Sequence, residues 1–213
     1  RRFTDYDLTM HNDVKTNTIK VVKLDGDSLV WFGSEDGLHK YDKSRGIEDE
    51  GTMSFYDSEL NYFKGEGDAV SISALLLEQN NIWIGLDEFV TKNNPDYNVG
   101  GIYKFDRKNE WIRFDSKTGL RGNGIYDMEI TGDYIWVSLY QFSKNTKDIY
   151  GRGLALINRI TEEAKMLDIE NFPLSTYAFH FDGNTLWIGT ENGIYSIDFT
   201  NDFVENFEIK KND

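Results

Sequence analysis

The chain has 213 residues, a formal net charge of −14 at pH 7 and no cysteine. A chain without cysteine has no disulfides, thiolate nucleophiles or cysteine-ligated metals, and a strong negative charge without a basic stripe argues against nucleic-acid binding. No run of apolar residues approaches the length that spans a membrane. An aromatic content of 15% with only 2 prolines favours β-sheets over helices or disorder.

The chain opens with a short aromatic stretch, 2–7 (RFTDYD), which resembles residues 111–115 (WIRFD) further along. It precedes the first complete repeat, so residues 1–8 are expected to form an extra outer strand. Because the sequence begins at Arg1, we expect any targeting signal to lie outside it.

A repeated unit of strand, turn and strand follows. It is clearest at 186–198 (LWIGTENGIYSID). Leu-Trp-Ile predicts a buried strand, Glu-Asn-Gly a tight turn whose glycine can take a positive φ, and the alternating Ile-Tyr-Ser-Ile a return strand. Related segments begin at Leu29, Asn81 and Tyr134. Their tryptophans recur about every 50 residues and are expected on the second strand of each unit, mostly buried: Trp31, Trp83, Trp136 and Trp187.

This period, with four short antiparallel strands per unit, predicts an all-β fold, a β-propeller built from four blades. The expected blades lie within a single domain, 1–213, and cover approximately 17–64, 68–121, 122–175 and 176–208. Residues 210–213 are expected to fray.

Two closures of the four blades are possible. In one, 2–7 completes the last blade and closes a compact ring. In the other, 203–208 supplies that strand and the blades form an arc. The ring is favoured, because an open arc would expose an apolar blade face.

The segments WIGTENGIYSID and WFGSEDGLHKYD resemble the repeats of the two-component regulator propeller family, and the resemblance extends over four repeats and nearly the whole chain. The third repeat departs from it, since Ser138 stands where the others have glycine. Propellers of that family are typically extracytoplasmic sensing modules of bacterial signalling kinases. The resemblance therefore implies a periplasmic or extracellular location and a sensing role, although this chain contains no kinase segment.

The innermost strand of each blade offers one set of candidate site residues. Stepping by two along these strands groups Val22, Leu75, Met128 and Phe179 on one face as an apolar packing set. The opposite face is expected to line a narrow axial channel, where four ionisable residues would converge: Lys23, Asp127, Glu129 and His180. They would either bind a ligand or form ion pairs between blades that hold the ring.

Two long insertions between the second and third strands of blades two and three, 87–100 and 141–152, offer a second set. Adjacent blades would place them on the same rim, where aromatic and charged side chains suit sugar or peptide recognition. The candidate ligand-binding residues are Asp87, Glu88, Tyr97, Tyr140, Tyr150 and Arg152. The alternative is that these loops cap the propeller or pack on a neighbouring molecule.

The sequence contains no recognisable catalytic motif, metal-ligand spacing or cofactor fingerprint. The favoured hypothesis is a non-catalytic ligand-binding or sensing module, with no cofactor or metal, for a small molecule, glycan, peptide or another protein. The alternative is a small propeller enzyme, a lyase or hydrolase, that uses His180 with Glu129 or Asp127 as acid and base. An enzyme needs these groups open to a cleft.

Overall fold

The computed structural model describes residues 7–8, 16–46, 49–90, 92–199 and 208–212. Blade one contains β1 (Ile19–Asp25), β2 (Leu29–Ser34), β3 (Leu38–Asp42) and β4 (Met53–Tyr56). Blade two contains β5 (Ile72–Leu77), β6 (Ile82–Leu86), β7 (Gly101–Phe105) and β8 (Trp111–Phe114). Blade three contains β9 (Gly124–Thr131), β10 (Tyr134–Ser143), β11 (Asp148–Asn158) and β12 (Ala164–Met166). Blade four contains β13 (Thr176–Phe181), β14 (Thr185–Thr190), β15 (Gly193–Asp198) and β16 (Ile209–Asn212).

Each blade is an antiparallel sheet of four strands in sequence order, and the described residues contain no α-helix. The predicted all-β propeller architecture is therefore confirmed. The Leu/Ile-Trp-Ile runs form second strands because apolar, β-branched and aromatic side chains fit a sheet that is covered on both faces. Strand β6 is buried at every position. A tight turn joins β1 to β2, where Gly26 adopts a φ of 60°, a conformation that glycine takes at little cost.

Three hydrophobic clusters join the blades in sequence. The first lies between blades one and two and includes Trp31 and Leu75. The second lies between blades two and three and includes Trp83. The third lies between blades three and four and includes Trp136 and Ile188. Blades two and three therefore pack both of their faces against neighbouring blades, whereas blades one and four each pack one face.

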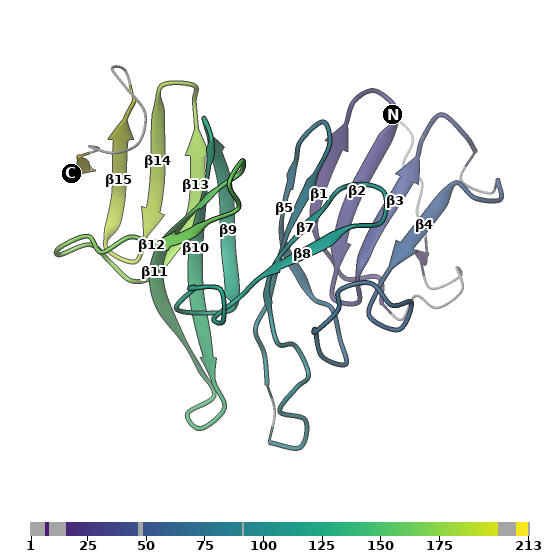
Figure 1. The fold of residues 1–213 in the computed structure, drawn as a ribbon, viewed down its shortest axis with the longest axis horizontal. Helices are drawn as coiled ribbons and strands as arrows, with labels where there is room; N and C mark the ends of the chain where they lie inside the picture. The colour runs from purple at the N-terminus through teal and green to yellow at the C-terminus, as the bar shows by residue number, and fades with distance from the viewer. Residues whose placement is uncertain (1–6, 9–15, 47–48, 91, 200–207, 213) are drawn as a thin grey trace.

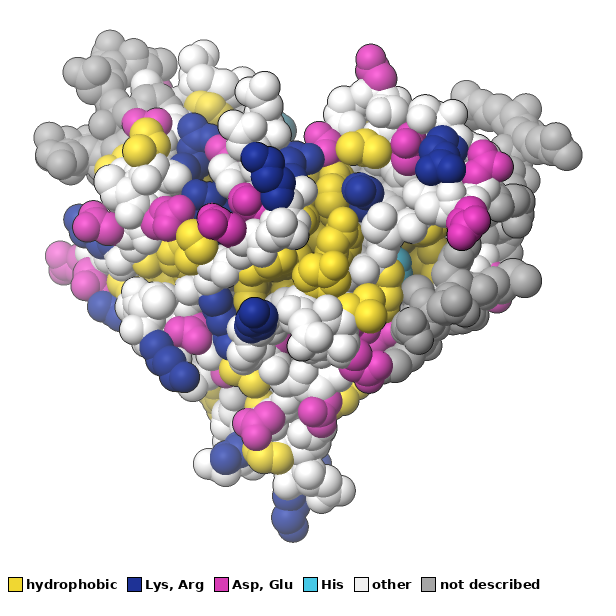
Figure 2. Space-filling model, turned by 45° about the vertical axis from the view of Figure 1, so that its right-hand side comes forward, with side chains coloured by type: hydrophobic (Ala, Val, Ile, Leu, Met, Phe, Trp, Pro, Cys, Tyr) yellow, Lys and Arg dark blue, Asp and Glu magenta, His cyan; other side chains and the backbone are white. Residues whose placement is uncertain are grey.

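In the described part of the chain the blades form an open arc rather than the favoured closed ring. Inner strand β1 packs on β5, β5 on β9, and β9 on β13, whereas β1 and β13 have no comparable packing. Figure 1 shows blade one at one end of the arc and blade four at the other. In Figure 2 the molecule has a two-lobed, heart-shaped outline, with hydrophobic side chains gathered at the bottom of the notch between the lobes.

The open ends change the predicted packing of single residues. Leu75 and Met128 are buried as expected, but Val22, the member of the same set in blade one, is 56% exposed because no blade covers it. All four repeat tryptophans lie on second strands, and three are buried. Trp187, in blade four, is 39% exposed.

The expected strand at 2–7 and the alternative outer strand at 203–208 fall almost wholly outside the described residues. The outer strand of blade four is β16, which pairs with β15 through Ile209 and its neighbours. Strand β16 extends blade four to Asn212, past the expected end at about 208 and into the segment that was expected to fray. Ile209 packs on the core between blades three and four, while the other residues of β16 are exposed.

Candidate functional site

The two insertions lie on the same rim of the middle blades (Figure 1). The connection between β6 and β7 and the hairpin of β10 and β11 project together at the lower edge of Figure 1, and the corresponding lower tip of Figure 2 is mainly polar. The second insertion was expected to be a loop, but most of it continues the two strands. Gln141 pairs with Tyr150 and Phe142 with Ile149, beyond a register shift at Leu139. Aromatic and β-branched residues in this segment favour an extended backbone over a loop.

Tyr140 joins the two insertions. Its side chain is 4% exposed, and its hydroxyl donates a hydrogen bond to Oδ1 of Asp87 at 3.0 Å. The same hydroxyl accepts a hydrogen bond from the backbone N–H of Glu88 at 3.1 Å. Burial raises the pKa of Tyr140, and the Asp87 carboxylate raises it further. The phenol is therefore neutral and serves as a fixed link between blades two and three.

Asp87 also ties the insertion to blade one. Its Oδ2 accepts a hydrogen bond from the hydroxyl of Ser71 at 2.6 Å and forms an ion pair with Lys20 of β1. Because its two oxygens bond groups from three blades, Asp87 acts as a structural junction rather than as a group free to bind a ligand.

Glu88 is bound in a similar way. Its Oε2 accepts a hydrogen bond from the backbone N–H of Phe142 at 3.0 Å. Burial raises the pKa of Glu88, while hydrogen bonds from the backbone of Phe142, Asn123 and Gly124 and the charge of Arg152 lower it. The aromatic rings of Phe89 and Phe142 also meet across the two insertions, with centroids 4.7 Å apart.

Tyr150 and Arg152 line a cavity of about 440 Å³ on this rim. Its other walls come from both insertions: Val90, Gln141, Phe142, Ser143, Lys144 and Asn145. Arg152 donates to Oε1 of Gln141 at 3.0 Å, and the Tyr150 hydroxyl lies 3.1 Å from that of Thr146. Of the six rim candidates the structure joins Asp87, Glu88 and Tyr140 in one bonded cluster and sets Tyr150 and Arg152 in the cavity wall.

Tyr97 lies apart from these groups. It is 40% exposed, and its ring meets that of Phe89 edge-on, with centroids 6.4 Å apart. Tyr97 was expected beside the other candidates, but it does not line the cavity; it precedes Asn98, which forms a β-bridge with Phe89.

The inner-strand candidates do not form the expected ion pairs. Within the described ranges no salt bridge involves Lys23, Asp127, Glu129 or His180. Instead, Asp127 Oδ2 accepts a hydrogen bond from the backbone N–H of Phe179 at 2.7 Å, and Glu129 Oε2 accepts one from that of Phe181 at 3.4 Å. The two carboxylates thus lie in the joint between the inner strands of blades three and four.

Burial is the main cause that raises the pKa of Asp127, and nearby Glu129 raises it too. The backbone hydrogen bonds and the charge of Lys23 act in the opposite direction. Lys23, Asp127 and Glu129 therefore share one electrostatic environment at the inner edge of the arc.

His180 is separated from the two carboxylates. Its strand neighbours Phe179 and Phe181 pack against the core shared with blade three. Side chains alternate along a strand, so His180 points to the opposite face of β13, which is exposed. The acid–base pair of the enzyme hypothesis would need both groups on one side. In the described residues no cluster of three His, Asp or Glu side chains could hold a metal ion.

Sequence reasoning missed Glu66, in the connection between blades one and two. Its carboxylate is fully buried and accepts hydrogen bonds from the backbone N–H groups of Gly67 at 3.0 Å and of Gly100 at 2.9 Å. Burial raises its pKa to about 7, against these bonds and the charge of Arg113. Glu66 fixes the base of the first insertion. The available signal was a lone glutamate between two glycines, at 65–67.

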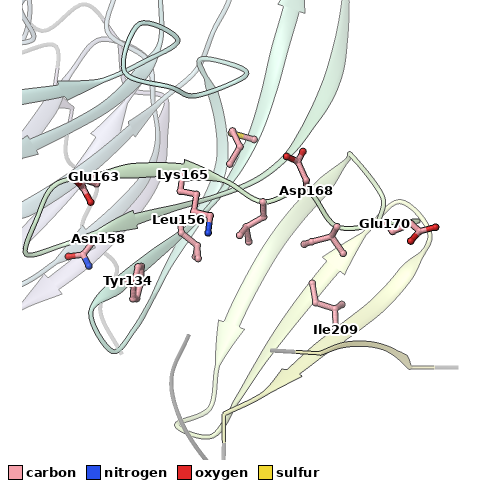
Figure 3. A pocket seen from close by; sticks show the side chains of 11 residues that line it. Tyr134, Leu156, Asn158, Glu163, Lys165, Asp168, Glu170 and Ile209 are labelled. Atoms are coloured by element: carbon pink, nitrogen blue, oxygen red, sulfur yellow. The ribbon is translucent and has the colours of Figure 1, made fainter. Parts of the chain in front are cut away.

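A second cavity, of about 870 Å³, was also missed. It lies between the outer parts of blades three and four (Figure 3). Its walls mix apolar and charged side chains, including Leu156, Lys165, Asp168, Glu170 and Ile209. Its residues come from β10, β11, β12, the segment after β12 and β16, a juxtaposition that depends on how two blades pack.

In the described part of the chain no helix is long and apolar enough to cross a membrane. No protein-family model matches the chain, and no curated protein matches its sequence.

Solved structures resemble the fold at low identity. The extracellular domain of a hybrid two-component system from B. thetaiotaomicron matches 90% of this chain with a TM-score of 0.60 and 17% identity. The extracellular domain of a second such system from that organism matches 94% with a TM-score of 0.50 and 17% identity. PorZ, a surface component of the type-IX secretion system of Porphyromonas gingivalis, matches 85% with a TM-score of 0.56 and 18% identity.

This chain spans 25%, 28% and 24% of those three structures, about a quarter of each. The likeness confirms, at the level of the fold, the resemblance to two-component regulator propellers that the four repeats predict.

Proposed function

We propose that the protein is a non-catalytic binding module of an extracellular or periplasmic sensing or surface protein, and that its ligand occupies the rim cavity between the insertions of blades two and three. The observation that carries the proposal is the construction of this rim. Buried hydrogen bonds, from Tyr140 to Asp87 and from the backbone N–H of Glu88 to Tyr140, fix the stems, while Tyr150 and Arg152 remain at the cavity. A rigid scaffold with adaptable polar and aromatic tips is typical of recognition sites. The likeness to extracellular domains supports the location.

The lining suggests the class of ligand. Lys144 and Arg152 are the charged residues among the cavity's lining side chains, and no carboxylate lies among them, on a chain whose net charge is −14. A local cationic site on an acidic protein favours an anion, and a guanidinium pairs well with a carboxylate. The aromatic rings of Phe142 and Tyr150 add apolar surface for a sugar ring or a peptide side chain. The ligand is therefore an acidic glycan or a peptide that carries a carboxylate.

A glycan and peptide array, followed by calorimetry on each hit, tests the proposal. We expect acidic ligands to bind, and Arg152→Gln and Tyr150→Ala each to weaken binding at least tenfold. Lys165→Ala, in the wall of the larger cavity between blades three and four, should leave the affinity unchanged. If Lys165→Ala weakens binding and the rim variants do not, the proposed site is wrong.

Shortening the β10–β11 hairpin is a second arm of the test. Removing 143–148 should retain the fold, because loop length changes the closure entropy only slowly and the buried contacts of Tyr140 lie outside the deleted segment. Binding should be lost. Unchanged affinity in a folded, shortened protein would contradict the rim site.

A further inference from the structure

The outer face of blade four, meaning the face turned away from blade three, exposes residues whose counterparts are buried in every other blade. Trp187 is 39% exposed, whereas Trp31, Trp83 and Trp136 are at most 3% exposed. The next blade covers each of those three tryptophans. Blade four keeps the same large apolar side chain on a face that no described residue covers.

The third strands show the same contrast. In each blade, a residue of the third strand pairs with the residue two positions after the repeat tryptophan. The pairs are Leu38 with Gly33, Ile102 with Gly85, Leu154 with Ser138 and Ile194 with Gly189. The first three of these apolar residues are at most 1% exposed, but Ile194 is 54% exposed.

The glycines explain how one blade receives the next. A Cβ on Gly33 would lie 2.4 Å from Cγ2 of Ile72, and a Cβ on Gly85 would lie 2.7 Å from Cγ2 of Ile125. These isoleucines are on the inner strand of the following blade, so each glycine makes room for a knob from its neighbour. A Cβ on Gly189 would meet only Ala178 of its own blade, at 3.8 Å. Blade four therefore has the hole without a knob.

Blade one carries the matching knob. Each inner strand has a register shift, and the residues just before it are Ile19, Ile72, Ile125 and Thr176. The latter three are fully buried against the preceding blade. Ile19 is 37% exposed, and Val22 and Leu24 on the same strand are 56% and 68% exposed.

Charges follow the same rule. The indole N–H of Trp31 donates to Asp25 at 2.9 Å, and Arg107 of blade two forms an ion pair with that carboxylate. In blade two the indole of Trp83 donates to Glu78 at 2.5 Å, and Arg159 of blade three pairs with Glu78. Each arginine follows directly after the third strand or its closing aspartate.

The joint between blades three and four has neither the carboxylate nor the arginine. The indole of Trp136 donates to the hydroxyl of Thr131 at 2.7 Å, and Phe199 of blade four, the counterpart of Arg159, lies against Trp136 with ring centroids 6.2 Å apart. The carboxylate and the cation thus occur as a pair across a joint or not at all.

The two ends of the arc complete this pattern. Trp187 donates to Asp182 at 2.9 Å, so blade four has the carboxylate, and within the described residues no cation pairs with it. Lys43 follows the third strand of blade one and is exposed. Its backbone N–H bonds Ser28 as that of Arg159 bonds Asp133. Blade one therefore offers a cation to a preceding blade.

We propose that the exposed face of blade one of a second copy of this chain docks on the outer face of blade four, head to tail, and that two copies close an eight-bladed ring. Ile19 enters the space over Gly189, Lys43 pairs with Asp182, and Trp187 and Ile194 become buried. A second copy is the occupant because knob and hole, and cation and carboxylate, lie on opposite ends of the same chain. Eight blades lie within the range that propellers adopt, and the inference does not depend on the rim ligand.

Sedimentation equilibrium and native mass spectrometry of the 213-residue chain test the proposal. We expect a two-copy complex whose tryptophan emission is blue-shifted on assembly. A monomer at all accessible concentrations would overturn it and leave the two faces to blades of another polypeptide segment or partner. Ile19→Asp and Gly189→Leu should each abolish the complex with unchanged circular dichroism. Ile112→Asp is the matched control, because Ile112 is also 37% exposed but lies on outer strand β8.

Mixing variants tests the head-to-tail arrangement. Ile19→Asp blocks only the blade-one face and Gly189→Leu only the blade-four face, so neither should associate with itself. Their mixture should form a two-chain complex through one intact joint. The double variant has both faces blocked, so it should associate with neither single variant. Ile19→Asp mixed with the double variant should therefore remain monomeric. If Ile19→Asp still forms a complex alone, two blade-four faces meet and the proposal is wrong.

Discussion

The hydroxyl of Tyr140 lies 3.0 Å from Oδ1 of Asp87 and bridges two blades from a position that is almost fully buried. The bond relates residues 53 positions apart in the sequence. It holds the two insertions side by side, so the rim depends on a hydroxyl group rather than on the sheets alone.

Replacing Tyr140 by Phe should therefore destabilise the protein. The variant keeps the ring but removes a hydrogen bond to Asp87 and leaves the backbone N–H of Glu88 without its acceptor. We expect the free energy of unfolding to fall by about 1–3 kcal/mol in urea denaturation. Tyr150→Phe is the control, since its hydroxyl contacts Thr146 at an exposed site. Equal effects of the two variants would contradict the structural role of Tyr140.

The glycines of the second strands should differ in their tolerance of a side chain. An added Cβ at Gly85 would lie 2.7 Å from Ile125 Cγ2, so Gly85→Ala should lower the free energy of unfolding by about 1–3 kcal/mol through overpacking. Gly189→Ala meets nothing closer than 3.8 Å and should change it by less than about 0.5 kcal/mol. Urea denaturation at low protein concentration measures both. An equal loss at both sites would contradict the view that the next blade packs on Gly85 while nothing packs on Gly189.

Tryptophan truncation should follow burial rather than repeat position. Trp83→Ala removes a fully buried ring and should cost about 3–5 kcal/mol. Trp187 is 39% exposed, and Trp187→Ala should cost about 1–2 kcal/mol, because a smaller apolar area returns to water. Thermal and urea unfolding of the two variants provide the comparison. A larger loss for Trp187→Ala in the monomer would contradict the open arc.

Glu66 should make stability depend on pH. Burial raises its pKa from 4.5 to about 7, so the folded state binds more protons than the unfolded state between these values. The free energy of unfolding therefore falls as the pH rises from about 4.5 to 7, by on the order of 3 kcal/mol for this group.

Glu66→Gln isolates the contribution. The amide does not titrate. As the pH rises across this window, the unfolding free energy of the parent should therefore fall relative to that of the variant. Glu88 and Asp127 also have raised pKa values, but they titrate in both proteins and cancel in the difference. A flat difference curve from pH 4 to 8 would refute the assignment.

Local patterns determined the strands and the blades. The apolar runs around the repeat tryptophans predicted second strands because their side chains need cover on both faces, and the register confirms this at Trp83 and Trp136. The same local logic placed the two insertions on one end of adjacent blades, where Asp87 and Tyr140 do meet. In the second insertion this local logic failed. The turn residues suggested a loop, although the alternating aromatic residues of the segment extend the two strands.

Contacts between blades decided the rest. A period of two predicts which residues share a strand face, but it does not say which neighbour that face meets. It thus grouped His180 with Glu129 in one channel, although blade four's own sheet separates them. Burial raises the pKa of Glu66, and the backbone groups that bond its carboxylate include one more than thirty residues away, the N–H of Gly100.

The sequence by itself determined four β-sheets and their order, because alternation, turn glycines and the tryptophan period act over a few residues each. Only the tertiary structure decided that the four sheets form an arc, which tryptophan is exposed, and which carboxylates are bound. These properties depend on the angle between neighbouring sheets and on side chains that lie close in space but far apart along the chain.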